Sequence, residues 1–439
     1  MDLQHAARMA KTAATRLSAL DGATKNEALT QIVKALEADT AAITAANRQD
    51  LAQAEKDGLA APLLKRLRFD EAKIQEACAG LRSLIQLPDP VGVTLSALEL
   101  DRDLELYKVS RPIGVIGVIF ESRPDALVQI SSLCLKSGNA LLLKGGSEAA
   151  RTNRILADTI TAAATRAHLP DGWLGLLETR DEVTEMLALD RFIDLIIPRG
   201  SNEFVRYIMD HTRIPVLGHA DGICHVYVDR EADLQMAVRV AVDSKCQYVA
   251  VCNAAETLLV HQDAARAFLP AVRDAFTQKG VALRGCAATR RIIDIPSATD
   301  EDWRTEYLDL MLSIKVVADM DAAVDHINTF GSGHTDVIVT ADRSKAVRFM
   351  DRVDSADVFW NCSSRFSDGF RYGLGAEVGI STNKIHARGP VGMEGLLIYQ
   401  WRMMGKGHVV ADYSGEGAKA FTHKQLHKRF GQSHAEPTP

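Results

Sequence analysis

The sequence lacks the features that mark secreted proteins, membrane-spanning proteins and proteins stabilised by a bound metal ion. Its 439 residues include seven cysteines, with no CxxC pair and no cysteine and histidine spacing typical of zinc ligands. Scattered cysteines in an odd number do not close a disulfide framework, so we expect free thiols, a cytoplasmic location and no metal site. No apolar run is long enough to span a bilayer, and the first ten residues lack the order of an export signal. We therefore expect neither a membrane anchor nor secretion.

The sequence also lacks an excess of basic charge. Lys and Arg number 51 against 57 Asp and Glu, which gives a formal net charge of -6, and no stretch forms a basic stripe. Nucleic acid is therefore not an expected partner. The composition, 47% hydrophobic and 25% charged, is that of a globular protein. The length is sufficient for about two or three domains with their own cores.

The first part of the sequence has a helical pattern. Residues 24–27, Thr-Lys-Asn-Glu, have the form of a capping box and precede apolar residues at helical spacing. A second helix is expected over residues 70–87, because Pro88 and Pro90 end the pattern there. These helices carry no residues that suggest chemistry, so we interpret them as scaffold.

From Arg111 onward, apolar strand-like segments alternate with helical ones. Strands are expected at 113–120, 140–143, 174–177, 192–197, 214–217, 256–260, 313–317, 336–340 and 357–360. Strands that are separated by helices form parallel sheets with helices on both faces. The predicted fold class is α/β, with two α/β lobes, and such an arrangement suits a cofactor on one lobe and a reacting group on the other.

A cysteine stands where a helical segment meets a strand. Cys252 lies in Tyr248-Val-Ala-Val-Cys252-Asn-Ala-Ala-Glu256, which runs directly into the apolar residues 257–260. A thiolate nucleophile needs a fixed sulfur with one open face, and a helix-to-strand junction can supply it. Free cysteine is also among the residues most often buried for packing. From this pattern alone, both interpretations stay open.

Two glycine-containing turns follow expected strands. Lys144 precedes Gly-Gly-Ser at 145–147, and Arg199-Gly200-Ser201 precedes a helix that begins near Asn202. Backbone N–H groups at a helix start favour an anion, so a dinucleotide phosphate fits both turns, although ordinary strand-to-helix turns look the same. The glycines at 373–379 have the wrong spacing for a dinucleotide fingerprint, and we interpret them as a tight loop.

Other polar residues stand at turns. Ser122 and Arg123 lie at a strand-to-helix turn, where Ser122 is either a helix cap or a catalytic hydroxyl. His219 stands near Cys224, although a histidine in such a position is more often structural. Arg371 and Arg388 join Arg123 as candidate substrate ligands, because a guanidinium fork matches phosphate and carboxylate.

Five segments form a set of motifs: Val251-Cys-Asn-Ala254, Glu306-Tyr-Leu-Asp309, Gly331-Ser-Gly-His-Thr-Asp336, Asp368-Gly-Phe-Arg371 with the residues to Lys384, and His386-Ala-Arg388-Gly-Pro390. Together they resemble the γ-glutamyl phosphate reductase family of the aldehyde dehydrogenase superfamily. The resemblance implies an aldehyde-dehydrogenase-like fold and NADPH-dependent reduction of L-glutamyl 5-phosphate to glutamate 5-semialdehyde, in proline biosynthesis. Cys252 is then the acyl acceptor, which forms a thioester.

The resemblance also assigns roles to other residues. Lys144 matches the position that contacts the adenine-side ribose, Glu306 the nicotinamide ribose, and Gly200 with Ser201 the cofactor pyrophosphate. Ser122 falls where relatives hold the oxyanion, and Asn253 with the Cys252 backbone N–H is the alternative.

His219 stands in place of the glutamate base of oxidising relatives, which favours hydride transfer over hydrolysis. The chain departs from the family pattern at Asp125, Ser201 and Tyr248.

Domain boundaries and partners complete the expectations. We expect an NADP-binding domain over 1–228 with 370–393 returning to it, and a catalytic domain over 229–369. We further expect an oligomerisation hairpin of 97–110 with 394–415 and a frayed polar tail at 416–439. Because this hairpin would be covered by another subunit, we expect a dimer or tetramer. As a partner we also expect glutamate 5-kinase, through functional coupling of the two enzymes. The alternatives are a Cys/His acyl hydrolase or acyltransferase that uses Cys252 and His219, and a scaffold protein without activity.

Overall fold

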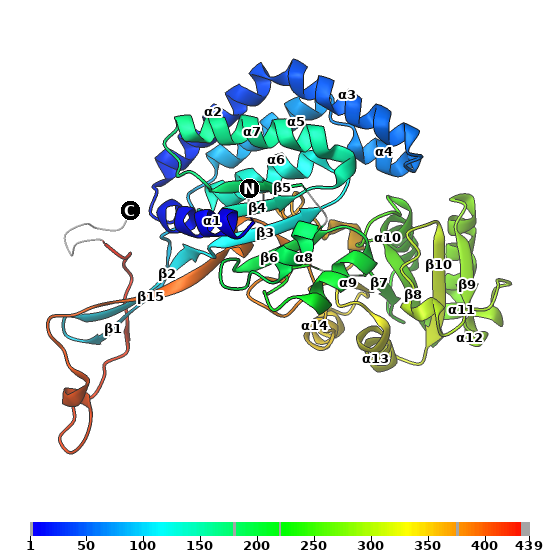
Figure 1. The fold of residues 1–439 in the computed structure, drawn as a ribbon. Helices are drawn as coiled ribbons and strands as arrows, with labels where there is room; N and C mark the ends of the chain where they lie inside the picture. Colours follow the sequence, from blue (N-terminus) through cyan, green and yellow to red (C-terminus); the bar gives the residue numbers. More distant parts are fainter. Residues whose placement is uncertain (1–2, 179–180, 219–220, 375–376, 432–439) are drawn as a thin grey trace. The chain divides into compact units, whose positions relative to one another are not determined.

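The chain divides into two compact units in a computed structural model, which describes residues 3–178, 181–218, 221–374 and 377–431 (Figure 1). The first unit comprises Met1–Gly200, Ile208–Val216 and Gly392–Pro439, and the second comprises Ser201–Tyr207 and Leu217–Val391. Helix α9 (Asn202–His211) begins in the second unit and ends in the first. His219, which the sequence analysis placed at the position of the glutamate base, lies outside the described residues.

The first unit is rich in helices, as the sequence predicted. They are α1 (Leu3–Leu17), α2 (Gly22–Ala38), α3 (Thr40–Lys56), α4 (Ala61–Leu67), α5 (Glu71–Gln86), α6 (Pro124–Lys136), α7 (Ala150–Arg166) and α8 (Asp181–Leu187). The Asp21 carboxylate accepts a hydrogen bond from the Thr24 N–H at 2.8 Å, so Asp21 caps α2. The predicted capping box at 24–27 is therefore wrong. Asp70 caps α5, at the predicted start.

A four-stranded parallel sheet forms the centre of the first unit. Its strands are β3 (Val115–Phe120), β4 (Ala140–Lys144), β5 (Leu174–Leu177) and β6 (Leu195–Arg199), in the order β5-β4-β3-β6. The crossover helices α6 and α7 pack against the sheet and against α2, α3 and α5, while α1 contacts β3, β4, β5 and α8 (Figure 1). Because helices cover the sheet, its strands are nearly continuous apolar runs.

An antiparallel sheet extends from the first unit. It consists of β1 (Thr94–Asp101), β2 (Leu104–Pro112), β15 (Leu397–Met404) and β16 (Lys424–Gln425), in the order β15-β2-β1-β16. The structure pairs β2 with β15, from Leu397 opposite Pro112 to Met404 opposite Glu105. The segment 97–110, expected as one half of a hairpin with 394–415, is instead parts of two strands, because a turn with Asp103 at φ 62° separates β1 from β2.

The polar segment after residue 416 is not a frayed tail as far as residue 431. Its strand β16 pairs with β1, with Leu98 opposite Gln425. Leu426 and Phe430 pack against a small apolar cluster of Ala97, Tyr107 and Val109. Two apolar side chains in a polar stretch are therefore enough to hold it, and this part of the prediction is wrong.

The second unit is built on a six-stranded parallel sheet. Its strands are β7 (Cys224–Val228), β8 (Ala255–His261), β9 (Ala282–Gly285), β10 (Met311–Val317), β11 (Thr335–Val339) and β12 (Asp357–Trp360), in the order β12-β11-β7-β8-β10-β9. Its further helices are α10 (Leu234–Cys246), α11 (Gln262–Gln278), α12 (Ala287–Arg290), α13 (Met320–Phe330) and α14 (Arg343–Arg352). A separate antiparallel pair joins β13 (Gly379–Ser381) and β14 (Gly389–Val391).

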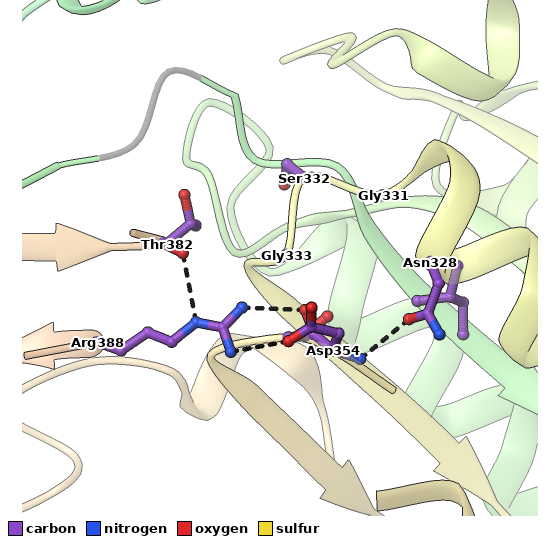
Figure 2. Close-up of a pocket in the computed structure, with 9 residues that line it drawn as sticks. Asn328, Gly331, Ser332, Gly333, Asp354, Thr382 and Arg388 are labelled. Carbon is purple, nitrogen blue, oxygen red and sulfur yellow. Dashed lines mark hydrogen bonds and ion pairs between the residues drawn. The ribbon is translucent and has the colours of Figure 1, made fainter. Parts of the chain in front are cut away.

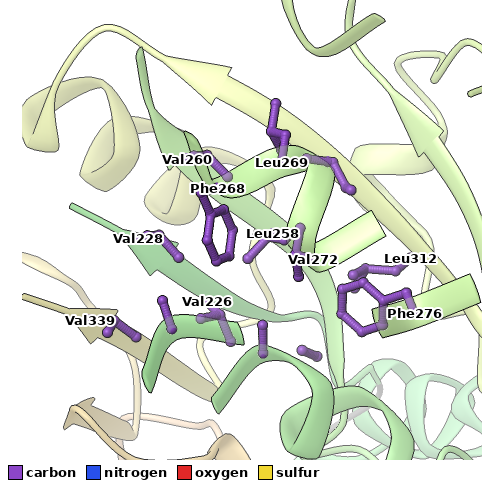
Figure 3. Close-up of a cluster of buried hydrophobic side chains, with 14 of the residues drawn as sticks. Val226, Val228, Leu258, Val260, Phe268, Leu269, Val272, Phe276, Leu312 and Val339 are labelled. Carbon is purple, nitrogen blue, oxygen red and sulfur yellow. The ribbon is translucent and has the colours of Figure 1, made fainter. Parts of the chain in front are cut away.

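Successive side chains of the central strands point to opposite faces of the sheet, so this unit has one apolar core on each face. Leu258 and Val260 point to one face, where they pack with Phe268 and Phe276 of α11 (Figure 3). Leu259, the residue between them, packs on the other face with residues of α13 and α14. A strand buried on both faces must be apolar at every position, which explains its continuous apolar sequence.

The compact units differ from the expected domain boundaries. Strand β7 lies within the expected first domain but hydrogen-bonds to β8 and β11 of the second unit. The segment 370–393 was expected to return to the first domain, whereas the contacts group it up to residue 391 with the second unit. Strand β9 was not predicted at all, because its four residues include an exposed alanine and a glycine.

Candidate active site

Cys252 lies in an irregular segment between α10 and β8, and it is half-buried. The buried Cys224 thiol of β7 donates a hydrogen bond to the Cys252 carbonyl at 3.1 Å. The turn is closed by the Ala254 N–H, which donates to the Val251 carbonyl at 3.1 Å. A half-buried sulfur on a main chain held from two sides meets the geometric needs of a nucleophile.

Gly222 packs directly against the main chain of Cys252. A Cβ atom placed on Gly222 would lie 2.2 Å from the Cys252 carbonyl oxygen and 2.5 Å from its Cβ atom. Real carbon contacts are about 3.5 Å or longer, so only glycine allows this approach. The sequence interpretation did not single out Gly222, because glycine before a strand has many uses.

Asn253 is anchored rather than free. Its side-chain amide donates to the Ser367 carbonyl at 2.7 Å, and its own carbonyl accepts from the Ser364 hydroxyl at 2.7 Å. In contrast, neither the Cys252 nor the Asn253 backbone N–H forms a hydrogen bond with the described residues. The main-chain donors next to the sulfur are therefore open to a ligand.

A buried ion pair flanks the segment that carries Cys252. Lys245, at the end of α10, donates to the Glu256 carboxylate of β8 at 2.6 Å, and both side chains are fully buried. Burial raises the pKa of Glu256 to about 7, against the opposing charge of Lys245. Glu256 also accepts from the Leu308 N–H at 3.4 Å. The pair thus fixes both ends of the segment and links it to the loop that follows Glu306.

Glu306 is held by the first residue of α9. The Asn202 side-chain amide donates to the Glu306 carboxylate at 2.6 Å and to Asp221 at 2.9 Å. The hydroxyl of Ser201 accepts from the Phe204 N–H at 3.4 Å, as an N-cap residue does. Ser201 and Glu306, two predicted cofactor residues, therefore lie close together in the second unit, because Asn202 follows Ser201 in the chain and binds Glu306.

The remaining predicted cofactor residues lie in the first unit. Lys144 ends β4, and Gly200 follows the end of β6; both strands flank β3, so their carboxyl ends share one edge of the sheet. Lys144 is buried, and its ammonium donates to the Gly145 carbonyl at 2.5 Å. A Cβ on Gly146 would lie 2.0 Å from the Glu148 carboxylate, so this glycine serves packing inside the protein.

Ser122 follows β3 on the same edge and is buried. Its backbone has φ 46°, and both its N–H and its hydroxyl donate to the Glu148 carboxylate, at 2.5 and 2.7 Å. The predicted alternative of a helix cap is not what the structure has, because the hydroxyl binds Glu148 and α6 has no side-chain cap. Arg123, its neighbour, is partly exposed and pairs with Asp125 at 3.1 Å.

The two other predicted arginines occupy different places in the second unit. Arg371 pairs with Asp368 at 3.2 Å and is partly exposed. Arg388 lines a pocket of about 360 Å³, where it donates to the Thr382 and Asp354 carbonyls and pairs with the Asp354 carboxylate at 3.3 Å (Figure 2). The guanidinium of Arg388 therefore holds two loops of the protein together.

Some elements of a site are absent from the described part of the chain. No group of three or more metal-ligating side chains that could hold an ion occurs there. No helix among the described residues combines the length and the apolar character needed to cross a membrane.

Sequence reasoning also missed Arg365, which is buried beside the anchored residues 364–367. Its only sequence signal is a basic residue in a serine-rich turn after β12.

Known proteins resemble this chain over almost its whole length. Residues 1–284 match the family model described as the aldehyde dehydrogenase family. The chain is 63% identical to the γ-glutamyl phosphate reductase of Pelotomaculum thermopropionicum, over 98% of this chain and 99% of the relative. It is 60% identical to that of Acetivibrio thermocellus, over 98% and 100%. The crystal structure of γ-glutamyl phosphate reductase from Thermotoga maritima is 39% identical, with a TM-score of 0.91 over 93% of this chain and 100% of that one.

Proposed function

The chain belongs to the γ-glutamyl phosphate reductase family of aldehyde dehydrogenases, and we propose that it reduces L-glutamyl 5-phosphate to L-glutamate 5-semialdehyde with release of phosphate, in proline biosynthesis. The predicted family and fold class are confirmed. The observation that carries the function is the similarity along the full chain, in which Cys252 occupies a fixed and half-buried position. The hydrolase alternative is set aside, because the relatives that match the whole chain bear the reductase name.

Cys252 is the proposed acyl acceptor. Its thiolate attacks the carbonyl carbon of the acyl phosphate, a carbon–sulfur bond forms, and phosphate leaves with the electrons of the carbon–oxygen bond. Hydride addition to the thioester gives a thiohemiacetal oxyanion, and its collapse releases the aldehyde and returns the thiolate. The oxyanion of both tetrahedral stages needs N–H donors. The uncommitted N–H groups of Cys252 and Asn253 support a main-chain hole, since the side chains of Ser122 and Asn253 already donate elsewhere.

Membership of the aldehyde dehydrogenase family implies a nicotinamide cofactor, which supplies the hydride when it is bound. The residues fit such a group by their chemistry. A carboxylate that is held in place, such as Glu306, accepts from ribose hydroxyls, and the N-terminus of α9 at Ser201 offers N–H groups to phosphate. We propose NADPH as the form used, with the Lys144 ammonium at the end of β4 near the adenine-side ribose and Gly200 at the pyrophosphate turn.

Partners follow from the reaction and from the antiparallel sheet. The substrate L-glutamyl 5-phosphate is an acyl phosphate, so we propose functional coupling to glutamate 5-kinase, which forms such a compound. Strand β15 exposes Tyr399 and Trp401, each about half accessible to solvent at 50% and 52%. An exposed apolar edge strand is an aggregation risk unless another chain covers it, so we propose a homo-oligomer that pairs through this sheet.

The nucleophile is tested by removing its sulfur. Cys252→Ala is expected to abolish NADP- and phosphate-dependent oxidation of the semialdehyde, which is the convenient direction to measure, while the protein stays folded. Cys286→Ser is the matched control, because Cys286 is also a half-buried thiol of the second unit and has no proposed role. Turnover retained in Cys252→Ala, or lost equally in both variants, contradicts the assignment.

A further inference from the structure

Arg365 is a buried cation that forms no ion pair with a carboxylate of the described residues. It lies in the short 3-10 helix η3 (Ser364–Phe366), and only 9% of its surface is exposed. Its guanidinium makes one hydrogen bond within the described chain, from Nε to the Gln247 side-chain oxygen at 2.9 Å. No carboxylate of the described residues forms an ion pair with it. A buried charge of this kind is costly unless something else compensates it.

Other deeply buried cations of the protein are compensated internally. Lys25 pairs with Asp89 at 2.6 Å, and Lys245 pairs with Glu256 at 2.6 Å. Lys136 pairs with no carboxylate among the residues that the structure describes, but it donates to a side-chain oxygen and to two carbonyls. Arg365 has one neutral acceptor, so both of its Nη nitrogens remain for a ligand. Compared with these lysines, Arg365 is held for binding rather than for internal pairing.

The segment of Arg365 is fastened to the residue next to the nucleophile. The Ser364 hydroxyl donates to the Asn253 carbonyl, and the Asn253 amide donates to the Ser367 carbonyl, both at 2.7 Å. These two bonds bracket Arg365 in the chain. The main chain on both sides of Arg365 is therefore tied to the residue that follows Cys252. Burial and the charge of Arg371 lower the pKa of Arg365, against the opposing charges of Cys252, Asp368 and Asp243.

We propose that Arg365 binds an anionic group of the substrate, a carboxylate or a phosphate, beside Cys252. The inference rests on the proposed function, whose substrate carries a carboxylate at one end and an acyl phosphate at the reacting end. A guanidinium whose two Nη nitrogens are uncommitted matches either group by a pair of parallel hydrogen bonds. Gln247 orients the fork through Nε without neutralising it, which makes Gln247 a positioning residue.

Two substitutions test the charge of Arg365 without removing its bulk. Gln247→Glu is nearly isosteric and gives Arg365 a carboxylate partner of its own, which competes with the substrate anion. Arg365→Lys keeps the charge but loses the fork. In the oxidation of the semialdehyde, each variant should raise one KM at least about tenfold and change kcat less. A raised KM for phosphate identifies the phosphate group, and a raised KM for the semialdehyde identifies the carboxylate.

A second measurement works without turnover. In a Cys286→Ser background, alkylation of Cys252 by iodoacetamide is followed with increasing inorganic phosphate or L-glutamate. The half-protecting concentration of one of the two should rise about tenfold in both variants. Arg273→Gln is the control, because Arg273 pairs with its neighbour Asp274 on the exposed face of α11. Urea unfolding checks that each variant is folded.

The outcomes separate this inference from the proposed function. If both KM values and both half-protecting concentrations stay within about threefold of the wild type, Arg365 binds no substrate anion and the inference is overturned. It is also overturned if only the pH profile of Cys252 alkylation moves, since Arg365 then acts on the thiol alone. If the wild type fails to oxidise the semialdehyde, the proposed function fails, while the protection by phosphate or glutamate still tests Arg365.

Discussion

The close approach of Gly222 to Cys252 leads to a sharp prediction for Gly222→Ala. The added Cβ would lie 2.2 Å from the Cys252 carbonyl oxygen, 2.3 Å from its Cα and 2.5 Å from its Cβ. All three contacts involve the main chain or the first side-chain atom, so no rotamer change can relieve them. The main chain of residue 222, residue 252 or both must move.

The size of the movement sets the size of the effect. Ordinary carbon contacts begin at about 3.5 Å, so relief requires a shift of about 1 Å at the segment that carries the sulfur. Misplacing a reacting group by about 1 Å can cost roughly a hundredfold in rate. We therefore expect kcat/KM of Gly222→Ala to fall about a hundredfold. Overpacking of this kind costs stability by about 1–3 kcal/mol, which leaves a folded protein to measure.

Steady-state oxidation of the semialdehyde gives kcat/KM, and urea unfolding gives the change in stability. The matched control is Gly80→Ala in α5, where an added Cβ has no atom within 4 Å and the backbone is helical. That control should keep full activity and gain about 0.5–1 kcal/mol of stability from helix propensity. A folded Gly222→Ala whose kcat/KM stays within threefold of the wild type would refute the role of this contact in fixing the sulfur.

Three further predictions concern stability and assembly. Burial lowers the pKa of His326 to about 2, so the neutral ring stabilises the fold above its unfolded pKa of about 6.5, and this stabilisation is lost as the pH falls. The wild type should therefore lose about 2 kcal/mol more of its free energy of unfolding in urea between pH 7 and pH 5 than His326→Gln does. Equal losses in the two proteins would contradict this. Phe276→Ala should cost about 3–5 kcal/mol in urea unfolding, because the ring is fully buried in the core of the second unit; a loss below 1 kcal/mol would mean that the core refills the space. Trp401→Glu places a charge on the exposed strand β15 and should lower the molecular mass measured by sedimentation, because the oligomer dissociates. A wild-type protein that is monomeric at micromolar concentration would contradict the proposed oligomer.

Elements with a strong local pattern could be predicted from the sequence, and elements held by distant contacts could not. Strand β12 and helix α5 occur where apolar spacing and capping residues indicated them, because both signals lie within the element. Strand β7 was not among the predicted strands, since its pairing with β8 and β11 depends on residues up to about a hundred positions away. Strand β16 was missed for the same reason, because it pairs with β1, which lies far away in the sequence.

The candidate site divides in the same way. Cys252 and Glu306 stand in motifs that the family shares, so resemblance could identify them, and the structure adds how Asn202 holds Glu306. Arg388 was chosen for its guanidinium alone, and the structure engages that group with Asp354 and Thr382. Arg365 has the same side chain, but within the described part of the chain it bonds only to the neutral Gln247. A sequence gives the type of a charged residue, whereas its function depends on whether the fold has already neutralised it.

The predicted oxyanion donors show the same limit of the sequence. Ser122 and Asn253 were selected because a hydroxyl and an amide are recognisable donors in a sequence. The fold has already used both, for Glu148 and for the Ser367 carbonyl. The backbone N–H groups of Cys252 and Asn253 form no hydrogen bond with the described residues, but every residue except proline has such a group and no sequence pattern can distinguish it. The local path of the chain around Cys252, which Gly222 permits, leaves these groups open to the proposed substrate.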